Sequence, residues 1–242
     1  MHLRFIISLI LAGLCAPAIF AQGTNQPTVD ELIAKNIEAK GGSAKLNAVQ
    51  SIKQVSQFSM SGMAATMTVY AKRPNRVRQE VKIADKTVIS AFDGVTTWIV
   101  NPMVGSDRPI AVTGPQADML REQGDFDGPL VDYKTKGYKV ELVGPESLGE
   151  RKVTHLRLVS PSQQIVHLYL DASTNLEAKR STEVESLKLE QELDDYRPVE
   201  GVMIPFHIRL LVNGVPQSEM KVQSVEFNVA MDDAIFRMPK GQ

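Results

Sequence analysis

Short runs of β-branched and aromatic residues recur along most of this chain, and turn-forming residues separate them. Pro74-Asn75, Asp93-Gly94 and Asn213-Gly214 are three of these breaks, and the last is a strong hairpin signal. A spacing of about ten residues between turns is typical of an antiparallel meander. The sequence therefore predicts about 11–12 strands, at residues 54–58, 66–71, 77–83, 87–92, 95–100, 139–143, 153–159, 165–170, 176–183, 187–196, 202–212 and 215–227.

Few segments have the pattern of a helix. Thr28 and Glu31 form a capping box, apolar residues then recur at helical spacing, and Gly41 and Gly42 end the pattern. We expect a helix of about three turns here, a short second one at residues 43–49, and a single loop helix at residues 116–123. The loop helix lies in the only long Gly/Pro-rich stretch, residues 101–128.

The strands have one apolar and one wetter face. In residues 202–212, every second side chain is apolar, including Ile204, Phe206, Ile208 and Leu210. This number of strands offers more apolar area than the helices can cover. The sheet must therefore close on itself, form a sandwich or leave a cavity. A curved sheet partly covered by helices would leave an apolar hollow suited to hydrophobic ligands. We find no repeat or linker that divides the chain, and we predict one mainly β (α+β) domain at residues 22–242.

Residues 1–21 resemble a secretory signal, with His2 and Arg4 ahead of an apolar run too short for a comfortable membrane span. We expect cleavage after the small Ala21 and a periplasmic location. The alternative is lipidation at Cys15, which bulky Leu14 disfavours. Cys15 is the only cysteine, so the mature domain has no disulfide and depends on its core.

The composition and motifs argue against several functions. A net charge of −1 without a basic stripe disfavours nucleic-acid binding. No metal-ligand spacing, phosphate loop or nucleophile motif is present, so we expect no metal, no cofactor and no enzymatic activity. If the loop between their strands has two or four residues, His155 and His167 point to opposite faces. An envelope hydrolase with a scattered site remains an alternative.

Two blocks carry a resemblance to a known family. The turn Lys72-Arg73-Pro74-Asn75 is followed about twenty residues later by Asp93-Gly94 with Trp98 and Asn101-Pro102 behind it. This ordered pair, covering residues 46–105, resembles the periplasmic outer-membrane lipoprotein carriers (LolA-like). Residues 168–171 and 195–205 resemble the broader lipoprotein-sorting branch, although the loop at 101–128 is longer than the family pattern suggests.

The resemblance implies a half-barrel whose concave apolar face, covered by helices, holds the acyl chains of a lipid or lipoprotein. It further implies a monomer that collects its cargo from an inner-membrane donor complex and delivers it to an outer-membrane acceptor. A membrane-anchored acceptor or an envelope sensor on the same fold are alternatives. By its position in the motif, Arg73 would hold the lid closed by donating hydrogen bonds to helix and loop carbonyls. The alternative is that Arg73 is a turn residue whose side chain lies in solvent.

We predict that the cavity is lined by seven apolar or thioether side chains. Flexible methionines suit ligands of varying shape, although they also fill cores, and the tryptophan could instead anchor its strand. The predicted lining is Met60, Met67, Trp98, Ile204, Phe206, Ile208 and Leu210.

Overall fold

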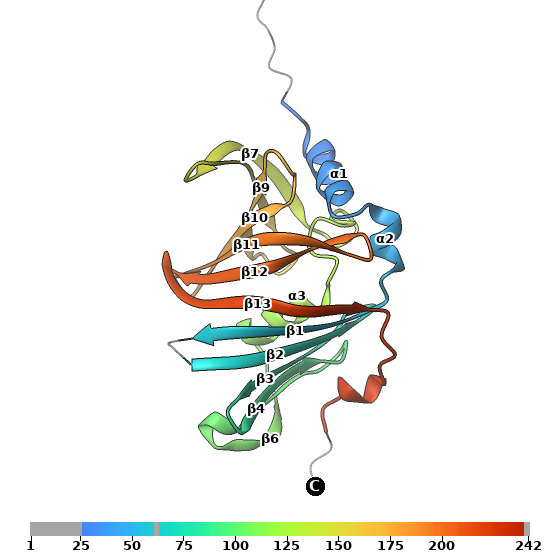
Figure 1. The fold of residues 1–242 in the computed structure, drawn as a ribbon, viewed down its shortest axis with the longest axis vertical. Coiled ribbons are helices and arrows are strands. Elements are labelled where there is room, and N and C mark those ends of the chain that lie inside the picture. The colour runs from blue at the N-terminus through green and yellow to red at the C-terminus, as the bar shows by residue number, and fades with distance from the viewer. Residues whose placement is uncertain (1–25, 61–62, 240–242) are drawn as a thin grey trace, which may run out of the picture.

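The computed structural model describes residues 26–60 and 63–239, whose main element is one open antiparallel sheet of thirteen strands (Figure 1). The strand order is β6-β5-β4-β3-β2-β1-β13-β12-β11-β10-β9-β8-β7. The first and last strands therefore pair in the middle of the sheet, and β6 and β7 form its edges. The sheet does not close into a barrel, and its open, curved form confirms the predicted half-barrel.

Each of the twelve predicted strands is present, within a few residues at its ends. The strands are β1 (Ser51–Met60), β2 (Met63–Lys72), β3 (Arg76–Ile83), β4 (Lys86–Phe92), β5 (Thr97–Asn101), β6 (Ser106–Ala111), β7 (Lys139–Leu148), β8 (Arg151–Val159), β9 (Ile165–Asp171), β10 (Glu177–Val184), β11 (Leu187–Val199), β12 (Val202–Val212) and β13 (Val215–Phe227). The sequence reasoning missed β6, a short edge strand inside the predicted loop.

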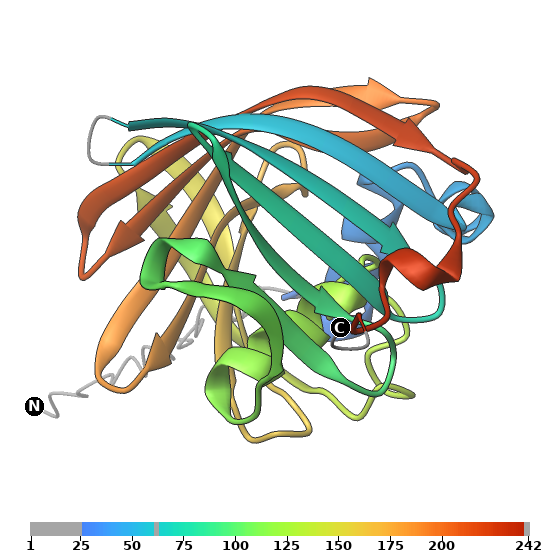
Figure 2. The same ribbon diagram turned by 90° about the horizontal axis from the view of Figure 1, so that it is seen from below.

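The helices are α1 (Val29–Ala39), α2 (Ser43–Ala48) and α3 (Pro115–Gly124), with 3-10 turns η1 (Pro102–Val104) and η2 (Asp233–Ile235). The capping box at α1 is confirmed: the Glu31 amide donates to Thr28 Oγ1 over 3.2 Å, and the Thr28 amide donates to the Glu31 carboxylate over 2.7 Å. Seen from below, the sheet arches over α1 and α3 (Figure 2).

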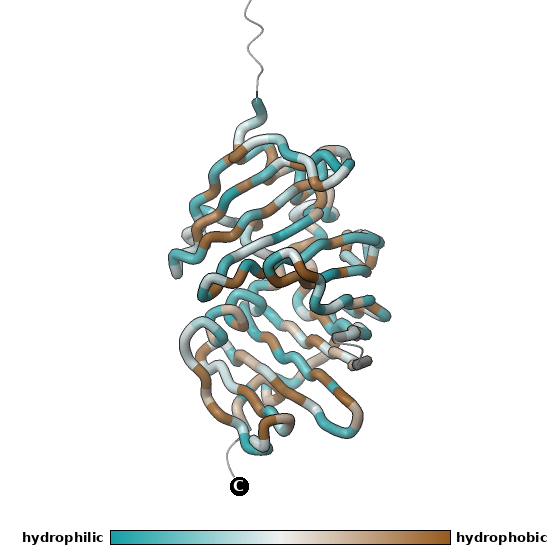
Figure 3. Tube along the Cα trace, turned by 90° about the vertical axis from the view of Figure 1, so that its left-hand side faces the viewer, coloured by the Kyte–Doolittle hydropathy of each residue, from teal (hydrophilic) through white to brown (hydrophobic). Residues whose placement is uncertain are grey.

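Three hydrophobic clusters attach the helices to one face of the sheet, which we call the concave face. Leu32 and Ile33 of α1 pack on β8 and β9, and Leu46 of α2 packs on β12 and β13. Leu120 of α3 packs on Val77 and Phe92 of β3 and β4. Hydrophobic and hydrophilic residues alternate along many of the strands (Figure 3). The result is a half-barrel with its helices inside, as predicted.

Candidate ligand-binding face and latch

Strand register shows which residues share the concave face. Ile204 packs in the cluster beneath α2, so the alternate residues Phe206, Ile208 and Leu210 of β12 lie on the same face. Ile208 stands opposite Met220 of β13. All four residues of β12 are only partly buried, unlike the core beneath the helices. The concave face therefore keeps accessible apolar surface between the helices.

Met67 belongs to the same face on the other half of the sheet. It pairs with Ser56 of β1 and with Val81 of β3, which in turn pairs with Val88 of β4. Ile52, four residues before Ser56, packs in the cluster beneath α2, so this row also faces inward. Met60 is the last residue of β1, and its side chain lies outside the described part of the structure.

Trp98 is a correction to the predicted cavity. Its neighbours Thr97 and Ile99 line a concave cavity, so by strand alternation Trp98 faces the convex side. It is fully buried there, and its Nε1 donates to the carbonyl of Phe236 over 2.8 Å. Trp98 therefore anchors the C-terminal segment on the convex face, which agrees with its predicted alternative role as a strand anchor.

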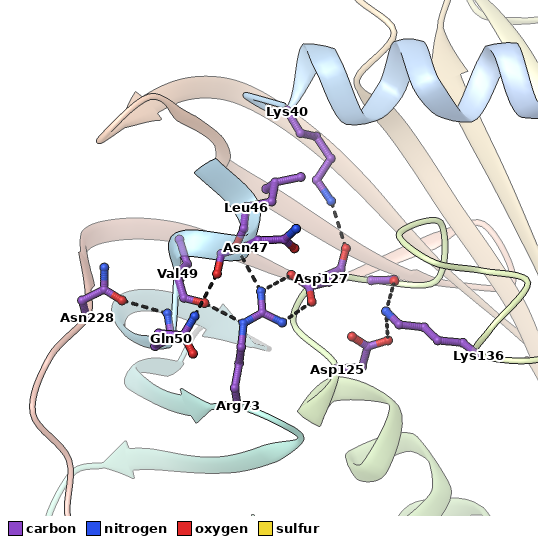
Figure 4. Close-up of polar contacts among 11 residues, drawn as sticks. Lys40, Leu46, Asn47, Val49, Gln50, Arg73, Asp125, Asp127, Lys136 and Asn228 are labelled. Carbon is purple, nitrogen blue, oxygen red and sulfur yellow. Dashed lines mark hydrogen bonds and ion pairs between the residues drawn. The ribbon is translucent and has the colours of Figure 1, made fainter. Parts of the chain in front are cut away.

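Arg73 lies in the turn between β2 and β3 and contacts two segments, the end of α2 and the loop at Asp127 (Figure 4). Its Nε donates to the Val49 carbonyl over 2.7 Å, and its Nη2 donates to the Leu46 carbonyl over 3.0 Å. Both carbonyls lie at the C-terminal end of α2, where the Leu46 carbonyl also accepts from the Val49 amide at 3.2 Å, and a planar guanidinium can donate to both. The contacts to helix carbonyls that the resemblance implied are therefore present.

Asp127, which the sequence did not indicate, completes the contacts of Arg73. Its two carboxylate oxygens accept from both terminal nitrogens of Arg73, at 2.7 Å for Nη2 to Oδ1. The Phe126 ring lies 4.8 Å from the guanidinium carbon. Hydrogen bonding to Asp127 raises the pKa of Arg73, so the guanidinium stays charged at any physiological pH.

Two lysines tie the Asp127 segment to its surroundings. Lys40, which caps α1, donates from Nζ to the Asp127 carbonyl over 3.2 Å. Lys136 pairs with the Asp125 carboxylate at 2.6 Å and donates to the Gly128 carbonyl at 3.0 Å. Thus the end of α2 and the loop at Asp127 contact the guanidinium directly, and Lys40 at the end of α1 contacts the same loop (Figure 4). We call Arg73, Leu46, Val49 and Asp127 the latch.

A cavity of about 160 Å³ lies between α3 and the concave side of β3, β4 and β5. Polar uncharged and apolar side chains share its wall: Gln79, Ser90, Thr97, Ile99, Val112, Gln116, Met119, Leu120 and Gln123. Gln79 donates to the Gln123 side chain across it. The concave face therefore carries polar as well as apolar side chains at this cavity.

Charged side chains also occur on the concave face, on β10. Arg180 pairs with Leu168 of the α1 cluster and so faces inward, and the Glu177 carboxylate accepts from it at 2.8 and 3.0 Å. Attraction to Glu177 raises the pKa of Arg180. Burial raises the pKa of Glu122 on α3, and the nearby charge of Arg180 partly offsets this by lowering it. Arg180 and Glu177 therefore satisfy each other, while the Arg197 guanidinium of β11 lies 4.7 Å from the centre of the Phe206 ring on β12.

The convex face holds a histidine pair that the sequence prediction separated. Residues 160–164 form a five-residue loop, so His155 and His167 lie on the same face, 2.8 Å apart between Nε2 and Nδ1. His155 Nδ1 also contacts the Glu146 carboxylate at 2.6 Å. Within residues 26–60 and 63–239, no group of three or more His, Cys, Asp or Glu side chains is arranged to hold a metal.

Comparisons with known proteins show the fold. No known protein family's sequence profile matches the chain, and no curated protein matches it. A LolA superfamily protein from Nitrosomonas europaea has 16% identity, a TM-score of 0.58, and coverage of 87% of this chain and 98% of its own. A DUF1329 family protein from Desulfovibrio piger has 11% identity and a TM-score of 0.59, with 86% and 97% coverage.

A domain assigned to the outer membrane lipoprotein-sorting proteins, from Vibrio parahaemolyticus, has 10% identity and a TM-score of 0.54, with 84% and 97% coverage. Each comparison spans nearly the whole of the other chain, so the likeness extends to the full half-barrel and not to one hairpin. Among the residues described, no helix has the length and apolarity needed to cross a bilayer. The chain has a LolA-like fold.

Proposed function

We propose that this protein is a periplasmic carrier that binds the acyl chains of a lipid or lipoprotein and performs no chemistry on them. The observation that carries the proposal is the partly exposed apolar surface of β12 and of the Met67 row, on the concave face of a sheet with helices inside. A LolA-like fold shared with a lipoprotein-sorting domain supports it.

The energetics favour a cargo with more than one chain. Burying a CH₂ group contributes about 0.8 kcal/mol, so one twelve-carbon chain contributes at most about 10 kcal/mol. Association costs on the order of 4–15 kcal/mol, which offsets much of this. A single chain would therefore bind less tightly than two or three chains on one cargo, which would be held firmly until a partner competes.

The latch would set when the cargo can enter or leave. Because Arg73 joins the end of α2 to residues 125–128, both segments must separate from the β2–β3 turn for the concave face to open at this end. We propose that contact with an inner-membrane donor or an outer-membrane acceptor shifts this equilibrium. Arg73 is then a gate residue, with no direct contact to the cargo.

The proposal includes export and a single mature domain. Residues 1–21, outside the described part of the structure, act as the signal, and residues 22–242 are the carrier. Cleavage after Ala21 leaves a protein free to leave the membrane, as a shuttle requires. Lipidation at Cys15 would instead retain it as an anchored acceptor.

Native mass spectrometry tests the proposal. Protein purified gently from the envelope fraction of expressing bacteria should carry adducts whose masses match acylated molecules. Met67→Glu, which places a carboxylate on the concave face, should reduce the adducted fraction. A ligand-free mass in both proteins would contradict the carrier function.

A further inference from the structure

Three uncharged polar side chains lie on the concave face of the N-terminal half of the sheet, in a row that Val69 interrupts. Gln79 of β3 pairs with Ser90 of β4, and on its other side with Val69 of β2, which pairs with Gln54 of β1. We call Gln54, Gln79 and Ser90 the polar row. It is two residues along each strand from the apolar row of Met67, Val81 and Val88. A row that is polar apart from Val69 therefore lies beside a row that is apolar apart from Ser56.

The polar row ends in the cavity under α3. Gln79, Ser90, Gln116 and Gln123 bring amides and a hydroxyl to its wall, and Thr97 adds a second hydroxyl. None of the nine lining side chains is charged. Since a water molecule has a share of about 30 Å³ in the liquid, a cavity of about 160 Å³ has room for a group of several heavy atoms.

Thr97 places a buried hydroxyl at the wall of this cavity, which a ligand group would reach once neighbouring side chains shift. The residue is only 2% exposed, and its Oγ1 has no hydrogen-bond partner among the described residues. Its carbonyl is already used, accepting from the Val112 amide at 2.9 Å. A buried hydroxyl without a partner costs about 1–3 kcal/mol, whereas the isosteric valine would avoid this cost.

We propose that this cavity binds the uncharged polar group of an acylated ligand, an ester, amide or hydroxyl, while the acyl chain lies along the Met67 row. The inference rests on the proposed carrier function and adds a specificity to it. A charged head group would lose its hydration in this cavity without a lining side chain of opposite charge. The cavity thus favours the glyceryl or amide linkage of a lipid over a free fatty acid.

Calorimetric titration of the mature protein with three probes tests this. Monolauroylglycerol has the chain and a neutral head, lauric acid has the chain and an anionic head, and glycerol has the head alone. The wild-type protein should bind monolauroylglycerol most tightly. Thr97→Val should weaken that binding about tenfold, the value of a typical hydrogen bond, and leave lauric acid binding unchanged.

Thr96→Val is the matched control, because Thr96 is adjacent to Thr97 and does not line the cavity. It should alter neither affinity. In the ligand-free protein, Thr97→Val should raise the melting temperature, because it removes the unpartnered hydroxyl.

Equal affinities of Thr97→Val and wild type for monolauroylglycerol would overturn the inference and leave the carrier function standing. Glycerol binding that depends on Thr97 would also overturn it, because the cavity would then be a site for free polyols. Failure of every variant to bind either acyl probe would instead contradict the carrier function itself.

Discussion

Replacing Arg73 with leucine should loosen the lid without unfolding the sheet. The substitution removes the hydrogen bonds to the Leu46 and Val49 carbonyls and leaves Asp127 without its partner. The leucine can still pack on Phe126, so part of the apolar contact remains. We expect residues 43–49 and 125–128 to open more often while the strands stay paired.

The size of the effect follows from the burial of the latch. The Arg73 and Asp127 side chains are 25% and 11% exposed, between a surface ion pair and a buried one. Such a pair should contribute about 1–2 kcal/mol, and the two carbonyl hydrogen bonds about 1 kcal/mol each. A loss of about 3 kcal/mol corresponds to roughly a hundredfold larger population of the open lid.

Native-state hydrogen exchange measures this population. The Val49 amide, bonded to the Leu46 carbonyl, and the Gly128 amide, bonded to Asp125, should exchange about a hundredfold faster in Arg73→Leu. Arg76→Leu is the control: Arg76 lies on the same turn and is 29% exposed, but it pairs with Asp233 of the C-terminal segment at 2.8 Å. It should accelerate exchange at Phe236 only. Unchanged exchange at Val49 and Gly128 in Arg73→Leu would refute the latch.

Three further predictions test the packing and the electrostatics. Gly124→Ala should lower the melting temperature by several degrees and loosen α3, because an added Cβ would lie 2.4 Å from the Asn75 carbonyl oxygen; an unchanged melting temperature would contradict this close approach. Burial opposes ionisation of Asp171, but hydrogen bonds from Arg151 and residues 173–174 outweigh it and lower its pKa. Its stabilisation should be complete above about pH 4 and be lost on further acidification, and Asp171→Asn should flatten that loss in urea titrations. Burial and nearby His155 lower the pKa of His167, so stability should fall as the pH drops below about 6.5. His167→Gln should show a smaller fall between pH 7 and pH 5, and an identical fall would exclude His167 as the cause.

Local signals in the sequence predicted most of the fold. The capping box at Thr28 and the hairpin at Asn213-Gly214 depend on residues close in the chain, and both are present. The strand β6 was missed because Asp107, Arg108 and Pro109 lack β propensity, and a proline is tolerated on an edge strand.

The site was less predictable, for two physical reasons. β5 is buried on both faces, by α3 on one and the C-terminal segment on the other, so its sequence does not alternate and the side of Trp98 could not be predicted. Asp127 lies 54 residues from Arg73, and no local pattern indicates such a partner. The histidine pair depends on whether one loop has an odd or even number of residues.

The central claim is that acyl chains lie on the concave face. Calorimetric titration of monolauroylglycerol into wild type, Met67→Glu and Thr66→Glu tests it most directly. Met67 is on the concave face, whereas Thr66 is the next residue on the convex face, opposite Lys82, which can accept the new carboxylate as a partner. The account predicts at least tenfold weaker binding in Met67→Glu and unchanged binding in Thr66→Glu. Equal affinities in all three proteins would contradict it.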